Sequence, residues 1–181
     1  METLEVSPRD FRAALGRFAS GVTVVTVPEA GERAGVRGVT ANAFLSVSLR
    51  PPLVLVSIDK KARAHAALQS AERYGVSILA QDQGPISDHF AGFAETVTPT
   101  FTELSGLAVV EGAVAHLVCR IVDRHEAGDH TLFIGEVEAL ATNDGQGEVK
   151  DGAKDGVKDD ANGAGGDAPL LYFKGGYGRF V

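Results

Sequence analysis

The chain has 181 residues, enough for one domain with a sizeable core, and its hydrophobic and charged fractions of 44% and 23% are typical of a globular protein. Its 24 acidic and 17 basic residues give a formal net charge of −7 without a basic cluster, which argues against a nucleic-acid or membrane partner. The acidic N-terminus does not resemble a signal peptide, and no apolar run approaches the ~18 residues of a membrane span. Cys119 is the only cysteine, so we expect a soluble, single-domain protein of the reducing cytoplasm.

A helix is predicted at the start of the chain. Ser7 can cap it, Pro8 suits its first turn, and Gly21 is expected to end it. Its apolar residues recur at helical spacing: Phe11, Ala14, Leu15 and Phe18.

The next segments predict strands. Residues 22–27 form a β-branched run, residues 28–35 have the composition of a turn, and residues 36–44 return as the second strand of a hairpin. The run 53–58, which follows two prolines, is apolar on both faces and therefore predicts a central, buried strand.

Short elements and then long strands are predicted for the rest of the chain. Asp59 is available to cap the first helix of this part. The expected elements are a helix over 62–71, a strand over 74–79, a short helix or turn over 84–91, antiparallel strands over 113–122 and 130–140 joined by a turn at 127–129, and a last strand over 170–174. Many strands with helices only in the connections indicate an antiparallel barrel with peripheral helices.

The composition changes sharply once, at residues 143–167. This segment has 7 Gly, 6 Asp, 1 Glu and 3 Lys but no Leu, Ile or aromatic residue. A four-residue repeat inside it has the spacing of a helix, but Gly152 and Gly156 would each cost about 1 kcal/mol there. We therefore expect a flexible surface insertion within a single domain that spans residues 1–181.

Several common kinds of site are absent from the sequence. No P-loop, no Gly-x-Gly-x-x-Gly fingerprint after a strand and no Gly-x-Ser-x-Gly elbow occurs. The five histidines include no pair four residues apart, and only one thiol is available, so a metal site is not expected.

Small and hydroxylic residues crowd the segment 38–52, just before the predicted buried strand. Thr40 and Asn42 can donate hydrogen bonds to a phosphate or a heteroaromatic edge, and Ala41 and Ala43 allow close approach to the backbone. The alternative interpretation of this segment is an ordinary polar strand end.

Three basic residues follow the predicted buried strand over 53–58. Lys60, Lys61 and Arg63 stand at the predicted start of a helix, an arrangement that suits an anion, although a solvated basic turn has the same composition. Segment 38–52 and the basic residues 60–63 lie on either side of the predicted buried strand 53–58. Together they favour a phosphate-bearing cofactor more strongly than either of them does alone.

The order and spacing of several motifs resemble the flavin reductase-like, FMN-binding split-barrel family, the reductase components of two-component flavin-dependent monooxygenases. The resemblance covers nearly the whole chain. It includes Phe-Ala-Ser-Gly-Val-Thr-Val-Val-Thr at 18–26, Thr-Ala-Asn-Ala-Phe at 40–44, Val-Ser-Ile-Asp at 56–59, His-Phe-Ala-Gly at 89–92, Gly-Asp-His-Thr-Leu-Phe-Ile-Gly-Glu-Val at 128–137 and Pro-Leu-Leu-Tyr-Phe at 169–173.

The resemblance implies a mainly β fold: an antiparallel, Greek-key split β-barrel with peripheral helices, assembled as a homodimer whose second subunit completes the flavin groove. It implies an NAD(P)H:flavin oxidoreductase that supplies diffusible FAD or FMN in reduced form to a partner monooxygenase. NADH is favoured over NADPH because no dedicated basic pocket for a 2′-phosphate is evident.

The resemblance also implies roles for individual residues. Lys60 and Lys61 are possible electrostatic helpers, and Arg63 would bind the flavin phosphate with its planar fork. The full set implied for flavin is Val39, Thr40, Ala41, Asn42, Ala43, Ser57, Ile58, Asp59, Arg63, Ala64, His89 and Phe90. For NADH, the candidates are His130, Gly176 and Tyr177, with His130 positioning the nicotinamide.

Two other functions use the same barrel. A non-catalytic protein could hold flavin or haem without turnover, and a related oxidase could act on a pyridoxamine-like amine with its own flavin. Without the resemblance, His130 is equally well interpreted as an exposed turn histidine, and Cys119 as a core residue.

Overall fold

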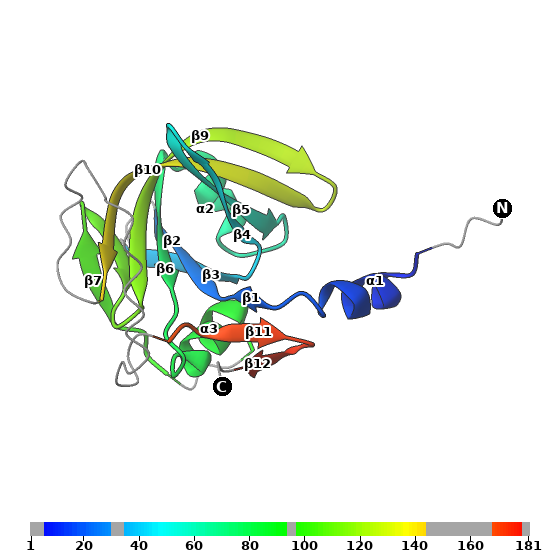
Figure 1. The fold of residues 1–181 in the computed structure, drawn as a ribbon. Helices are drawn as coiled ribbons and strands as arrows, with labels where there is room; N and C mark the ends of the chain where they lie inside the picture. The colour runs from blue at the N-terminus through cyan, green and yellow to red at the C-terminus, as the bar shows by residue number, and fades with distance from the viewer. Residues whose placement is uncertain (1–5, 30–34, 94–96, 144–167, 179–181) are drawn as a thin grey trace.

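The structure is a computed structural model that describes residues 6–29, 35–93, 97–143 and 168–178 (Figure 1). Its helices and strands are α1 (Pro8–Leu15), β1 (Ser20–Gly21), β2 (Thr23–Glu29), β3 (Gly35–Ala41), β4 (Phe44–Leu49), β5 (Pro52–Asp59), α2 (His65–Ser70), β6 (Arg73–Ile78), α3 (Gly84–Ala91), β7 (Phe101–Leu104), β8 (Leu107–Val110), β9 (Ala115–Ala127), β10 (His130–Thr142), β11 (Leu171–Phe173) and β12 (Gly176–Gly178). The predicted mainly β architecture with peripheral helices is confirmed.

One antiparallel sheet forms the body of the molecule. Its seven strands run in the order β3-β2-β6-β9-β10-β5-β4, and Figure 1 shows the sheet curling back on itself. Residues 42 and 43 link the two edge strands β3 and β4, and the carbonyl of Ala43 accepts from the amide of Ser57 on β5 at 3.0 Å, next to the pair formed by Phe44 and Val56. Two small sheets, β1-β11-β12 and β7-β8, complete the split barrel.

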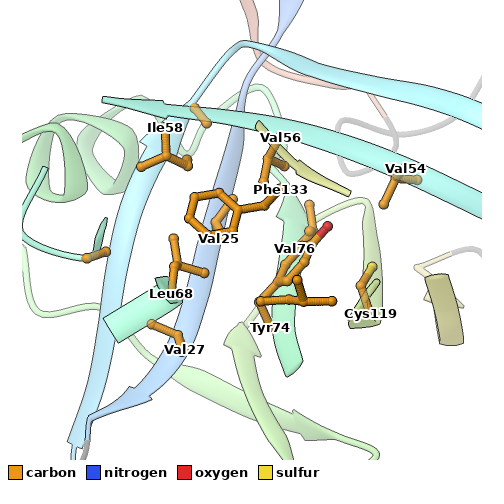
Figure 2. Close-up of a cluster of buried hydrophobic side chains, with 13 residues drawn as sticks. Val25, Val27, Val54, Val56, Ile58, Leu68, Tyr74, Val76, Cys119 and Phe133 are labelled. Atoms are coloured by element: carbon orange, nitrogen blue, oxygen red, sulfur yellow. The ribbon is translucent and has the colours of Figure 1, made fainter. Parts of the chain in front are cut away.

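The core fills the inside of this barrel. The rings of Phe133 and Tyr74 are fully buried between aliphatic side chains of facing strands, as Figure 2 shows. Leu68 of α2 is also fully buried and points into the same cluster, so α2 closes one end of the barrel. Cys119 is buried as well, which confirms its prediction as a core residue.

Helix α1 agrees with the prediction at its start and differs at its end. The Ser7 side chain accepts a hydrogen bond from the amide of Asp10 at 3.1 Å, as an N-cap does. The helix ends at Leu15 with Gly16 as its C-cap, so the predicted end at Gly21 is wrong. Residue Gly21 pairs instead with Leu171 in β1, because β11 offers it strand partners that local sequence does not reveal.

Strand β5 and helix α2 differ from the prediction, the strand in its position and the helix in its first residue. Strand β5 lies next to the sheet edge, and only its inner face, with Val54, Val56 and Ile58, is buried. Helix α2 begins at His65 rather than at residue 62, because residues 60–64 form turns. The Asp59 carboxylate accepts from the amide of Lys61 at 2.8 Å in the first of these turns, so Asp59 does not cap the helix.

The long hairpin of β9 and β10 in the middle of the sheet follows the prediction. Strands β9 and β10 join through a tight turn in which Gly128 has a φ of +62°, a conformation that glycine adopts without strain. The predicted last strand is β11, and the structure adds β12 behind it. Apart from Asn143, the predicted insertion lies outside the described residues.

Candidate functional site

Two grooves collect most of the residues singled out from the sequence. The first, which we call the β3 groove, has a volume of about 660 Å³ and lies between β3, the turn before α2, and the end of α3. The second, which we call the tail groove, has a volume of about 890 Å³ and lies between α1, the turn that joins β11 to β12, and the start of β10. Both volumes fall in the ~300–1,000 Å³ range of small-molecule sites.

Contacts between α3 and β3 shape the β3 groove. The hydroxyl of Thr40 donates to the carbonyl of Ser87 at 2.6 Å and ties the two elements together. The ring of Phe90 then lies against the backbone of Gly38, where a side chain would collide with it. Of the flavin set, Val39, Thr40, Arg63, His89 and Phe90 line this groove.

His89 lines the β3 groove, and its ring packs edge-on against Phe90 at 5.0 Å. Its Nδ1 is buried and has no hydrogen-bond partner among the described residues. This nitrogen is closed off from the groove, so His89 faces a ligand with the other atoms of its side chain.

The turn between β5 and α2 provides a basic end to the groove. The amides of Lys60, Lys61 and Ala62 bind acceptors within the protein, but no described acceptor meets the amide of Arg63. The Arg63 side chain is exposed and has no ion-pair partner in the described part of the chain. A free amide and a free guanidinium on the same residue suit a phosphate group.

The remaining members of the flavin set lie elsewhere. Ala41, Ile58 and Ala64 belong to the core and line neither groove. Ser57 and Asp59 project from the outer face of β5, where Asp59 is in register with His130 of β10. The structure therefore brings five of these residues into one groove but puts Ser57 and Asp59 on a different surface.

His130 lies in the tail groove, as Asn42 does. Its Nδ1 is 2.7 Å from the carboxylate of Asp129, and this hydrogen bond lowers the pKa of Asp129. Thr40 lines the β3 groove and Asn42 lines the tail groove, so one short segment contributes to both grooves.

The C-terminal candidates only partly match this groove. Gly176 and Tyr177 do not line it, while their neighbours Lys174 and Gly175 do. The hydroxyl of Tyr177 donates to the carboxylate of Asp88 at 2.6 Å, so Tyr177 attaches β12 to α3. Sequence reasoning missed Tyr172, which lines the tail groove and packs edge-on against Tyr177. Tyr172 belongs to the family motif at 169–173, and this membership could have identified it as a candidate.

Sequence reasoning also missed Arg37. It lines the β3 groove beside Arg63 and forms an ion pair with Glu29. The residues next to Arg37 in the sequence do not indicate a binding role, because its position in the groove depends on the pairing of β2 with β3. The complete arrangement suits a heteroaromatic ligand with a phosphate in the β3 groove and a second ligand beside it.

Comparisons with known proteins agree with this geometry. Residues 15–180 match the model of the flavin reductase like domain family. An NADH-dependent flavin reductase of a Rhodococcus species is 53% identical over 142 residues, which cover 78% of this chain and 81% of the relative. A reductase component of 4-hydroxyphenylacetate 3-monooxygenase from Thermus thermophilus is 37% identical over 94% of this chain and 95% of its own.

Solved structures give the same result. The flavin reductase PheA2 superimposes with a TM-score of 0.80 at 42% identity, over 97% of this chain and 99% of that one. An NADH:FAD oxidoreductase of Streptomyces globisporus, solved with NAD and FAD fragments, superimposes with a TM-score of 0.75 at 36% identity, over 97% of this chain and 96% of that one.

Proposed function

This chain belongs to the flavin reductase-like family, and on that premise we propose that it is an NADH-dependent flavin reductase, the reductase component of a two-component flavin-dependent monooxygenase. It takes FAD or FMN as an exchangeable flavin and NADH as the reductant. The observation that carries this function is a pair of ligand-sized grooves to which one short segment contributes Thr40 on one side and Asn42 on the other. Hydride transfer requires two bound molecules in contact, so the flavin and NADH have to reach each other beside this segment.

The residues of the β3 groove fit a flavin. The guanidinium and the free amide of Arg63 bind the phosphate, and the side chains of His89 and Phe90 line the groove beside the ligand. Flavin, when bound, supplies the hydride acceptor, and the protein contributes position rather than a strong acid or base.

The tail groove positions the nicotinamide. His130 is held by Asp129 and lines this groove together with Asn42. The two reacting atoms must be held about 3–3.5 Å apart for transfer. His130 and Asn42 are therefore positioning residues for NADH, and no proton transfer is assigned to them.

The exposed face of the sheet supports a homodimer. Leu45, Leu55 and Ile134 are in register across β4, β5 and β10 on the outer face, and Leu45 is 60% exposed. Apolar patches of this kind on a folded chain indicate an interface. Ser57 and Asp59 share this outer face, so a second copy seated on it would bring these two residues into a site made by both subunits.

The cellular context follows from the reaction. We assign the protein to the cytoplasm, where NADH is available and the free thiol of Cys119 stays reduced. Within the described ranges, no helix has the length and apolar character needed to cross a membrane.

The test of the function is anaerobic mixing of the protein with NADH and either flavin. Many turnovers of NADH per protein, with bleaching of the flavin, are expected. A protein that binds flavin or haem without catalytic loss of NADH would be the non-catalytic barrel considered above, and the proposal would fail.

The test of the dimer is sedimentation of the wild-type protein and two variants. Leu45→Asp is expected to give monomers, whereas Leu140→Asp, which changes an exposed residue of β10 outside the Leu45, Leu55 and Ile134 row, is expected to stay dimeric. A wild-type monomer with full activity would contradict the homodimer.

A further inference from the structure

The end of helix α3 and its cap, residues 89–92, form one wall of the β3 groove. Two side-chain hydrogen bonds hold the helix directly before this wall. The hydroxyl of Thr40 on β3 donates to the carbonyl of Ser87 at 2.6 Å. The hydroxyl of Tyr177 on β12 donates to the carboxylate of Asp88, also at 2.6 Å. The position of the wall therefore depends on one bond to the sheet and one bond to the C-terminal strands.

The Tyr177 side chain runs along α3, which lies beside β12 (Figure 1). A Cβ built at Gly84, the first residue of the helix, would be 3.4 Å from the ring atom Cδ2 of Tyr177. Strand β12 is three residues long and, in the part of the chain that the structure describes, pairs only with β11. A strand this short is weakly held by its own ladder, so the Tyr177 side chain is important for the attachment of β12 to α3.

The hydrogen bond between Tyr177 and Asp88 joins a neutral donor to a charged acceptor. Burial and this bond to the Asp88 carboxylate raise the pKa of Tyr177 above its ordinary value, so the phenol keeps its proton and can donate. Within the described ranges, Asp88 forms no ion pair. The Tyr177 hydroxyl is therefore a main partner of this carboxylate, and bonds of this kind are stronger than neutral ones.

Strand β11 gives Tyr177 a fixed support. Leu170, just before β11, is buried in the second core cluster, and Tyr172 packs against the same cluster. The ring of Tyr172 is in register with that of Tyr177 and packs edge-on against it at 6.1 Å. Phe90 of the groove wall also packs against this cluster. The C-terminal strands and the end of α3 thus share one core, across which Tyr177 adds a polar link.

We propose that Tyr177 is a positioning residue for the flavin: through its hydrogen bond to Asp88, it holds the end of α3 in place as a wall of the β3 groove. This role rests on the proposed function, which puts the flavin in that groove, and it replaces the role toward NADH that the family resemblance implied. Tyr177 does not line the tail groove, where His130 lies. Loss of the bond lowers the fraction of molecules whose groove is ready to bind flavin, and with it the apparent affinity.

Tyr177→Phe removes the hydroxyl and keeps the ring. The variant is expected to bind FMN about three- to tenfold more weakly in a titration without NADH, because part of a hydrogen bond to a charged group is lost. Riboflavin is expected to lose the same factor, since Arg63 and not α3 meets the phosphate. The KM for NADH, measured at saturating FMN, is expected to stay within about twofold of the wild-type value.

Substitutions of the acceptor test the same bond from its other side. Asp88→Ala is expected to weaken FMN binding as Tyr177→Phe does, and the double variant is expected to be no weaker than either single one. Asp88→Asn retains a side-chain oxygen that can accept from Tyr177 and should recover most of the affinity. Asp82→Ala is the matched control and should bind FMN as the wild type does, because Asp82 is exposed just before α3 and lines neither groove.

Melting temperatures of the variants establish that each is folded, and Asp88→Ala carries the test if Tyr177→Phe is not. Unchanged FMN affinity in Tyr177→Phe, or additive losses in the double variant, would overturn the proposal. A KM for NADH that rises more than the KM for FMN would return Tyr177 to the NADH site and overturn it as well. The FMN titrations need no turnover, so they give a result even if the wild-type protein fails to oxidise NADH, which would refute the reductase function alone.

Discussion

The ring of Phe90 lies on the backbone of Gly38, so close that a Cβ built at residue 38 would be 2.5 Å from the ring atom Cδ1. Phe90 comes from the last turn of α3 and Gly38 from the middle of β3, and both line the β3 groove. The missing side chain therefore sets how closely α3 approaches the sheet and hence the width of the β3 groove.

Gly38→Ala is expected to weaken flavin binding and to lower the free energy of unfolding by about 1–3 kcal/mol, because the Phe90 ring must move into the groove. Titration with FMN and a denaturant melt measure the two effects. Gly21→Ala is the control, since a Cβ at Gly21 meets nothing within 4 Å. A double variant with Phe90→Leu should recover part of the stability, and an undisturbed Gly38→Ala protein would refute the close packing.

Arg63→Ala is expected to weaken FMN binding by about 1–3 kcal/mol, the scale of a hydrogen bond to a charged group. Riboflavin lacks the phosphate and should bind as before. Lys60→Ala serves as the comparison, because the Lys60 ammonium is paired with Glu126 at 3.4 Å and does not line the groove. If FMN and riboflavin lost affinity equally, the phosphate would have to bind elsewhere, with Lys61 as the next candidate.

His130→Ala is expected to raise the KM for NADH far more than the KM for flavin, because His130 lies in the tail groove and not in the β3 groove. Steady-state kinetics with each substrate varied in turn measure this difference. His130→Gln retains a side chain that can donate to Asp129 and should recover part of the loss. Equal effects on both substrates would identify His130 as an ordinary turn histidine.

Stability is expected to fall as the pH drops below about 6.5, in part because of His116. Burial lowers the pKa of His116, and its buried Nδ1 has no partner among the described residues. Between the lowered pKa and the ordinary value, the unfolded chain binds the proton and the folded chain does not. The stability contributed by neutral His116 is thus present above the unfolded pKa and is lost as the pH falls through the folded one.

Denaturant melts across this pH range in wild type and His116→Gln check that expectation. The variant should show a weaker dependence on pH, whereas His125→Gln, at an exposed position of the same strand, should retain the wild-type dependence. Identical pH profiles in wild type and His116→Gln would rule out this role.

Deletion of residues 144–167 in favour of a short Gly-containing turn is expected to leave the melting temperature and flavin reduction nearly unchanged. The flanks support this expectation. The amide of Asn143 donates to Val114 at 3.0 Å, and the carbonyl of Ala168 accepts from Gln81 at 2.8 Å. The Val114 amide in turn bonds to Ile78, so both flanks are anchored near the end of β6. A variant that failed to fold would show that the segment packs on the barrel.

Much of the fold could be predicted because its signals are local. The hydroxyl of Ser7 and the turn at Gly128 determine a helix start and a hairpin from the chemistry of one or two residues. The order of the motifs was sufficient to identify the family, and Thr40, Arg63 and His89 could be singled out within those motifs.

Other features depended on residues far apart in the sequence. The end of α1 at Leu15 reflects the pairing of Gly21 with Leu171, and the half-buried face of β5 reflects its place beside the edge strand β4. Arg37 reaches the groove only because β2 and β3 pair in one register, and Tyr177 reaches Asp88 across 89 positions. The sequence alone determined most of the longer elements and the family, since short-range propensity and motif order suffice for that. The short strands β1, β7, β8 and β12 were not predicted, because their partners are set by the tertiary structure. Only the tertiary structure decided which side chains share a groove, because that depends on strand register and on packing between distant segments.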